Sequence, residues 1–241
     1  MPLLAAVAVA AGAALQSATG FGFSVIAAPL VFAAVEKEEA VGLLIVLGTL
    51  VNVLTLLTEG RRPQPVARES AVILACSVPG AVAGVAVLRA LDAIALQVAV
   101  SVGVLATVVA RRLAAGRHLP SWMAVPAGVT AGALTTSTTT AGPPVIVYLL
   151  GRAIEPARVR DTMTVVFLGL SVVGVIALWL TGTHGAVPDA TLVVILVPVV
   201  VAGHLAGRPL FARLDRSGKY EPVLTVALLV AVLAGLATAL V

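Results

Sequence analysis

The sequence is poor in charged residues. Its Asp, Glu, Lys and Arg number 26 of 241 (11 acidic and 15 basic), a share of 11%, whereas an ordinary globular domain carries about 25%. Hydrophobic residues make up 60% of the chain. The composition therefore excludes a soluble domain and predicts an all-α polytopic protein that crosses the lipid bilayer several times.

Other absences exclude several function classes. The single cysteine, Cys76, lies in an apolar run and can form no internal disulfide. The chain has no Walker loop, no Cys and His pattern of a metal site and no Gly-x-Ser-x-Gly elbow. The sequence thus predicts no enzyme, no cofactor and no metal. The net charge of +4 comes from basic residues that flank apolar runs, which favours membrane topology over nucleic-acid binding.

The charged residues divide the chain cleanly. They fall in seven intervals, at 36–39, 59–69, 89–92, 111–117, 152–161, 189 and 208–221. No Asp or Glu lies between these intervals, so the usual carboxylate proton relay of a pump is missing. Since one crossing needs about 20 residues, six of the uncharged elements have the length of one crossing: 40–58, 70–88, 93–110, 162–181, 190–207 and 222–241. The other two, 1–35 and 119–151, are too long for one crossing and too short for two.

Each of the two long elements contains a break. Residues 135–144 read Thr-Thr-Ser-Thr-Thr-Thr-Ala-Gly-Pro-Pro, and glycine and proline interrupt a helix here. A shift of 120 positions lays residues 9–30 over 129–150 with 10 identities in 22, including Ser17/Ser137, Thr19/Thr139 and Gly22/Gly142 in the breaks. A second echo, Pro-x-x-Val-Ala-Gly, occurs at 79–84 and 198–203 and agrees with the duplication; ordinary small-residue helix packing is the simpler interpretation of these six-residue segments. The chain therefore reads as an N-terminal repeat at 1–118 and a C-terminal repeat at 119–241.

The basic residues predict the topology. Lys and Arg number 1, 3, 1, 3, 3, 0 and 4 in the seven intervals. If every element crossed once, the two sides would hold 9 and 6; if 119–151 enters and leaves on one side, they hold 13 and 2. We therefore expect two inverted-topology repeats, each a broken re-entrant hairpin followed by three transmembrane helices, with both termini outside.

The residues that carry these breaks resemble a known family. The segment at 20–30, Gly-Phe-Gly-Phe-Ser-Val-Ile-Ala-Ala-Pro-Leu, its partner Ala-Gly-Pro-Pro-Val-Ile at 141–146 and the Pro-x4-Gly helices are similar to the TauE/SafE family of sulfite and sulfonate exporters. The resemblance implies a transporter in the bacterial inner membrane whose partner is a small sulfur oxyanion or an organosulfonate, such as sulfite or sulfoacetate. The resemblance does not determine which anion is transported, in which direction, or with which coupling ion. It also leaves open whether the protein forms a homodimer.

Helix geometry predicts a binding site at the breaks. After each break a half-helix begins deep in the membrane, and its N-terminus carries partial positive charge and free N–H donors. Two such ends would form a cradle for an anion that must bind and then leave. The residues expected to bind the substrate are Ser17, Thr19, Gly20, Phe21, Gly22, Phe23, Ser24, Ser137, Thr138, Thr139, Thr140, Ala141, Gly142 and Pro143.

Several of these residues also allow a purely structural interpretation. Ser and Thr in membrane helices often bond a carbonyl one turn back, and the two phenylalanines fit packing or a gate. A gate or coupling role is open for Gln16, Asn52, His204 and Arg208, but the amides fit helix-to-helix hydrogen bonds, and the His204–Arg208 pair fits an interfacial anchor. An anion channel, and a membrane scaffold without transport, are the alternatives to a secondary transporter.

Overall fold

The chain folds into helices that lie in two layers. The computed structural model describes all residues except 1, 97, 100, 103–117, 153 and 218–241, and within the described residues all regular structure is helical. The α-helices are α1 (Pro2–Thr19), α2 (Phe23–Phe32), α3 (Lys37–Thr58), α4 (Ala67–Ala90), α6 (Ala124–Ser137), α7 (Gly142–Leu150), α8 (Pro156–Leu180) and α9 (Ala190–Ser217), and the short 3-10 turns are η1 (Ser121–Met123) and η2 (His184–Ala186).

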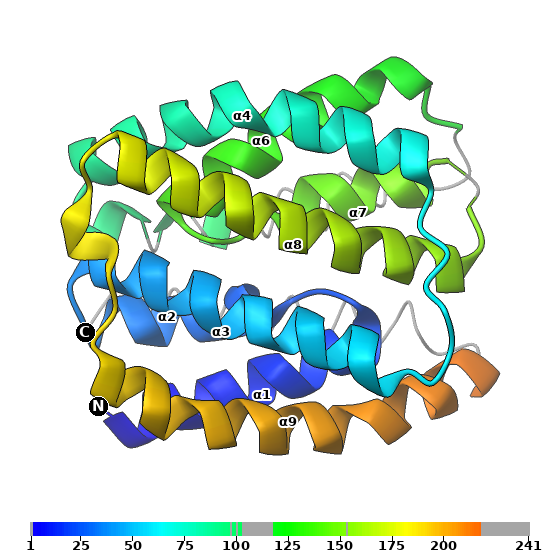
Figure 1. The fold of residues 1–241 in the computed structure, drawn as a ribbon, viewed down its shortest axis with the longest axis horizontal. Coiled ribbons are helices and arrows are strands. Elements are labelled where there is room, and N and C mark those ends of the chain that lie inside the picture. Colours follow the sequence, from blue (N-terminus) through cyan, green and yellow to red (C-terminus); the bar gives the residue numbers. More distant parts are fainter. Residues whose placement is uncertain (1, 97, 100, 103–117, 153, 218–241) are drawn as a thin grey trace.

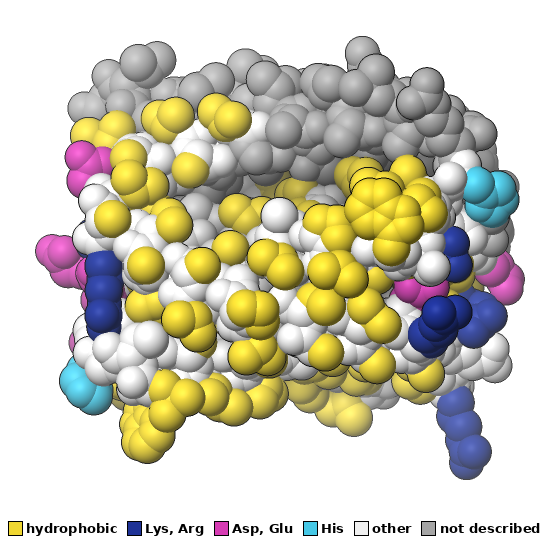
Figure 2. Space-filling view, turned by 90° about the horizontal axis from the view of Figure 1, so that it is seen from above, with side chains coloured by type: hydrophobic (Ala, Val, Ile, Leu, Met, Phe, Trp, Pro, Cys, Tyr) yellow, Lys and Arg dark blue, Asp and Glu magenta, His cyan; other side chains and the backbone are white. Residues whose placement is uncertain are grey.

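The long helices form one layer and the short ones the other. In Figure 1, α4, α8, α3 and α9 follow one another from top to bottom, with α6, α7, α2 and α1 beside or behind them. The four front helices correspond to the four candidate membrane spans among the described residues. Apolar side chains cover the middle of the face in Figure 2, and charged side chains gather at its two ends, as expected for a protein surrounded by lipid.

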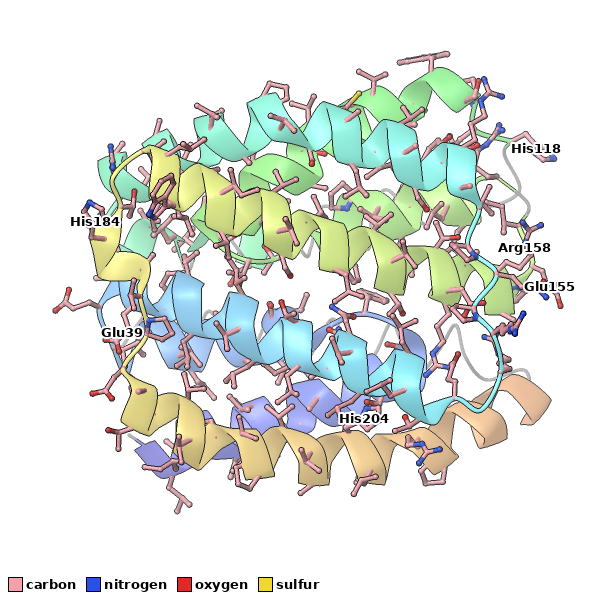
Figure 3. The ribbon with its side chains drawn as sticks, viewed as in Figure 1. Glu39, His118, Glu155, Arg158, His184 and His204 are labelled. Atoms are coloured by element: carbon pink, nitrogen blue, oxygen red, sulfur yellow. The ribbon has the colours of Figure 1, made fainter. Side chains whose placement is uncertain are left out.

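Polar contacts assign the loops to two opposite ends of the molecule. At one end Lys37 Nζ donates to Leu91 O at 2.7 Å, and Asp189 N donates to Glu39 Oε1 at 3.0 Å. At the other end Arg61 pairs with Asp161 at 2.7 Å. Figure 3 shows the same division, with Glu39 and His184 at one end and His118, Glu155 and Arg158 at the other. The intervals that the sequence assigned to the basic side, so far as they are described, therefore share one end.

The two breaks have backbone conformations that explain why the helices stop. Between α1 and α2, Gly20 and Gly22 have φ of 87° and 106°, values that glycine adopts without steric cost. Between α6 and α7, Thr139 has φ of 59°, which is uncommon for a β-branched residue. Leu119 N donates to Gly151 O at 2.8 Å, so the chain before η1 lies beside the end of α7.

Glycines allow the closest helix contacts. A Cβ on Gly84 would lie 2.2 Å from Ala133 O in α6, and one on Gly203 would lie 2.3 Å from Ala10 O in α1. These two glycines end the Pro-x-x-Val-Ala-Gly echo. The echo therefore marks two helix pairs, α4 with α6 and α9 with α1, in which backbones approach through a glycine.

The helices extend beyond the uncharged runs. The sequence predicted crossings at 40–58, 70–88 and 162–181, whereas α3, α4 and α8 begin three to six residues earlier. As a result, Glu69 lies in the first turn of α4 and Asp161 in the second turn of α8, and they are 6% and 2% exposed. The physical reason is that a helix continues past the hydrocarbon, where neighbouring polar groups satisfy its charges. The predicted crossing at 222–241 lies outside the described residues, as does most of 93–110.

Cysteine labelling tests the predicted orientation. In a Cys76→Ala background, Glu38→Cys and Asp189→Cys should react with an impermeant thiol reagent added outside intact cells, because the less basic end faces outward. Gln64→Cys and Ala157→Cys, at the basic end, should react only after permeabilisation. External labelling at both Gln64→Cys and Ala157→Cys would reverse the orientation.

Candidate functional site

A cavity lies where the two breaks face α3 and α8. Its volume is about 60 Å³, where one water needs at least about 10–15 Å³. Gly48, which lines it, is 11 residues from Lys37 and 10 from Thr58, so the cavity lies halfway along α3. None of its lining residues is charged: Gln16, Gly22, Ser24, Val25, Leu44, Ile45, Gly48, Asn52, Thr135, Thr139, Thr140, Ala141, Gly142, Phe167, Leu170 and Ser171.

The two breaks touch one another beside this cavity. A Cβ on Gly142, at the start of α7, would lie 2.9 Å from Cδ2 of Phe21 in the first break. Phe21 and Phe23 are 0% and 1% exposed and do not line the cavity. A Cβ on Gly12 would lie 2.6 Å from Phe23 O. Phe21 therefore packs against the start of the second break, whereas Phe23 packs against α1 and α3.

Two amides connect the first break to α3. Phe23 N, the first N–H of α2, donates to Gln16 Oε1 at 3.1 Å, and Gln16 Nε2 donates to Asn52 Oδ1 at 2.8 Å. Both side chains are buried, and both line the cavity. The sequence left these amides between helix-to-helix bonding and a role in the site, and the structure shows that they join helices and border the cavity at once.

Most hydroxyls of the second break bond the nearby backbone. Ser137 Oγ donates to Ala133 O at 2.7 Å, and Thr138 Oγ1 donates to Leu134 O at 3.3 Å. Thr139 Oγ1 donates to Thr138 O at 2.7 Å, and Thr140 Oγ1 lies 2.7 Å from Thr138 Oγ1. Each of these hydroxyls therefore has a partner inside the break or one turn back, as Ser and Thr in membrane helices often do.

The two half-helices differ in the donors that they present. In α2 the N–H groups of Ser24 and Val25 belong to the first turn, which has no intrahelical acceptors, and both residues line the cavity. In α7 the second and third positions are Pro143 and Pro144, which have no N–H. The first half-helix therefore presents more backbone donors to the cavity than the second.

His204 is buried away from the cavity. Its side chain lies between α3 and α9 (Figure 3) and is 1% exposed. Ser17 Oγ lies 2.6 Å from Nδ1, and Thr58 Oγ1 lies 2.9 Å from Nε2. The suggestion that His204 reaches the interface beside Arg208 is therefore wrong for the histidine, because both ring nitrogens have partners inside the protein. Arg208 itself donates to Thr58 O at 2.5 Å.

An ion network closes the basic end below the first break, and sequence reasoning missed it. Arg160 is 5% exposed, pairs with Glu59 and donates to Ser17 O at 2.8 Å. Arg61 bonds both carboxylate oxygens of Asp161, and this hydrogen bonding raises the pKa of Arg61. All four charged residues belong to the charged intervals 59–69 and 152–161. In the sequence they look like any other charged residues near a loop, so only their tertiary contacts reveal the network.

The structure brings together a subset of the residues that the sequence proposed. Those that line the cavity are Gln16, Gly22, Ser24, Asn52, Thr139, Thr140, Ala141 and Gly142. The other proposed residues do not line it: Ser17, Thr19, Gly20, Phe21, Phe23, Ser137, Thr138, Pro143, His204 and Arg208. Apart from Asn52, the sequence missed the wall from α3 and α8, which includes Gly48, Phe167 and Ser171, because these residues sit in plain apolar runs.

The fold and the cavity define a class of protein: a helical membrane protein with an uncharged polar cavity between two interrupted helices. The profile of the family described as Sulfite exporter TauE/SafE matches residues 4–235, nearly the whole chain. The chain therefore belongs to this family of membrane transporters, and the resemblance found in the sequence is confirmed. No curated protein and no solved structure gives a significant match to it.

The glycines of the breaks should resist substitution. Gly22→Ala adds a Cβ at φ of 106° and 2.7 Å from Leu15 Cδ2, and Gly142→Ala adds one 2.9 Å from the Phe21 ring. Each change should cost on the order of 1–3 kcal/mol and lower the Tm of the purified protein. Gly48→Ala is the matched control, because its Cβ has no neighbour closer than 3.4 Å. An unchanged Tm for both break variants would contradict this account.

Proposed function

We propose that the protein is a secondary transporter that exports a small sulfur-containing anion, sulfite or an organosulfonate, across the bacterial inner membrane. The observation that carries the proposal is the uncharged cavity halfway along α3, bordered by the first turn of α2 and by Gly142 at the start of α7. Helix N-termini attract anions through their free N–H groups and dipoles. Without a lysine or arginine among the cavity residues, the anion can also leave.

Alternating access is the mechanism that this arrangement supports. We propose two inverted repeats, 1–118 and 119–241, that rock about the cavity near the membrane midplane. The pairing of α1 with α9 and of α6 with α4 supports the symmetry, and the bond from Leu119 N to Gly151 O supports a hairpin that returns to its side of entry. Arg160 and its partner Glu59 would separate when the basic end opens.

An anion channel is the second candidate, because the described lining of the cavity offers no carboxylate for proton coupling. Proteoliposomes distinguish the two functions. A carrier saturates and exchanges labelled sulfite for unlabelled sulfite across the membrane, whereas a channel shows neither saturation at low concentration nor counterflow. Absence of any sulfite or sulfonate flux would refute both.

A fixed negative charge in the cavity should abolish transport. Gly48→Asp places a carboxylate in a position whose Cβ meets only ordinary contacts, and Gly48→Asn is its uncharged control of the same shape. Two like charges about 4 Å apart cost about 4 kcal/mol at an effective dielectric of 20, which is nearly three orders of magnitude in affinity. The Asp variant should therefore lose detectable uptake while the Asn variant keeps more of it. Equal transport by both variants would exclude the cavity as the site.

His204 is the described residue best placed to make transport depend on pH, because protonation would change its bonds to Ser17 and Thr58. His204→Gln should flatten the pH profile of uptake for an anion that does not titrate, such as methanesulfonate. An unchanged profile in proteoliposomes would assign His204 a structural role only.

A further inference from the structure

Hydrogen bonding fixes which way the two cavity amides point. The backbone N–H of Phe23 can only donate, so the Gln16 atom that it meets at 3.1 Å must be the oxygen. The other end of Gln16 is then the NH₂ group, and the Asn52 atom that it meets at 2.8 Å must also be an oxygen. Asn52 is therefore oriented by a backbone group that it never touches.

This orientation leaves the Nδ2 of Asn52 as a donor at the cavity. Asn52 is 3% exposed and lines the cavity. Its Oδ1 accepts from Gln16, while its Nδ2 makes no hydrogen bond to the described residues. The Nδ2 atom is also not one of the side-chain nitrogens that are fully buried without a partner. Ser24, on α2, also lines the cavity and offers its hydroxyl and its first-turn N–H. We call Asn52, Ser24 and Val25 the donor wall.

A second group of cavity residues presents acceptors. The hydroxyls of Thr135, Thr139 and Ser171 donate to the carbonyls of Ala131, Thr138 and Phe167 at 2.7, 2.7 and 2.9 Å. A hydroxyl has one proton, so each of these oxygens can offer only lone pairs to a ligand. All three residues line the cavity, and we call them the acceptor wall.

We infer that the cavity selects a sulfur oxyanion that carries a single negative charge and a hydrogen-bond donor of its own, such as hydrogensulfite or a hydroxyalkanesulfonate. This inference rests on the proposed function and refines its substrate. The donor wall binds the anionic oxygens, and the acceptor wall receives the ligand's proton. A dianion is rejected, because the cost of removing an ion from water rises with the square of its charge and no cation lines the cavity to offset it.

Three sulfonates of similar size separate the two requirements. Sulfoacetate carries two charges, 2-hydroxyethanesulfonate carries one charge and a hydroxyl, and ethanesulfonate carries one charge and no donor. Calorimetric titration of the protein in lipid nanodiscs should give the tightest binding for 2-hydroxyethanesulfonate, with sulfoacetate weaker by about tenfold or more, equivalent to about 1.4 kcal/mol. Ethanesulfonate should fall between the two.

Variants of Asn52 test the donor wall directly. Asn52→Asp replaces the donor by an ionised acceptor of the same shape and should weaken binding of 2-hydroxyethanesulfonate on the order of a hundredfold or more. Since this ligand does not titrate, partial recovery on acidification would report that the protonated carboxyl donates again. Asn52→Leu, which adds no charge, should cost about tenfold. Gln64→Glu, at an exposed loop residue, is the control for added negative charge.

The possible outcomes distinguish failure of this inference from failure of the proposed function. Sulfoacetate binding as tightly as 2-hydroxyethanesulfonate, or Asn52→Asp and Asn52→Leu both binding like the parent, would overturn the inference while sulfonate binding in the cavity still stands. Binding of none of the three sulfonates would overturn both the inference and the proposed function.

Discussion

The constraint on which this structure depends is that backbone polar groups in hydrocarbon need partners inside the protein. Two helices stop halfway across the molecule, at 20–22 and at 138–141, and each break frees N–H and C=O groups. The side chains around the breaks satisfy much of this demand: Gln16 accepts from Phe23 N, and Thr139 bonds the carbonyl before it. The groups still open at the first turn of α2 border the cavity. The break before α2 thereby leaves backbone donors at the cavity, where we propose that the anion binds.

Glycine makes the position of these breaks possible. Close backbone contacts at Gly84 and Gly203 hold α6 against α4 and α1 against α9, so each interrupted helix is fastened along a continuous one. The remaining wall of the cavity comes from α3 and α8, which cross beside both breaks. We propose that one repeat moves against the other around this cavity.

Charge is kept away from this cavity and concentrated at the ends. At the basic end Arg160 and Asp161 are buried, and both belong to an ion network that also holds Glu59 and Arg61. Breaking one partner of such a buried pair is costly. The cavity itself presents neutral donors, and in the proposed mechanism these would bind an anion less strongly than a cation would and let it dissociate.

The sequence alone determined the membrane class, the family, the two breaks and the grouping of charged loops, because composition, repetition and charge are properties of the chain itself. It also named half of the cavity residues, since hydroxyls, glycine and proline inside an uncharged run are tolerated in a membrane where a helix breaks beside a polar space. Only the tertiary structure decided that Ser137 and Thr138 bond their own helix, that His204 is buried, and that Gly48 and Ser171 complete the cavity. These facts depend on which faces of distant helices contact one another. A uniformly apolar run has no polar side that marks the face toward lipid, so the sequence cannot predict these contacts.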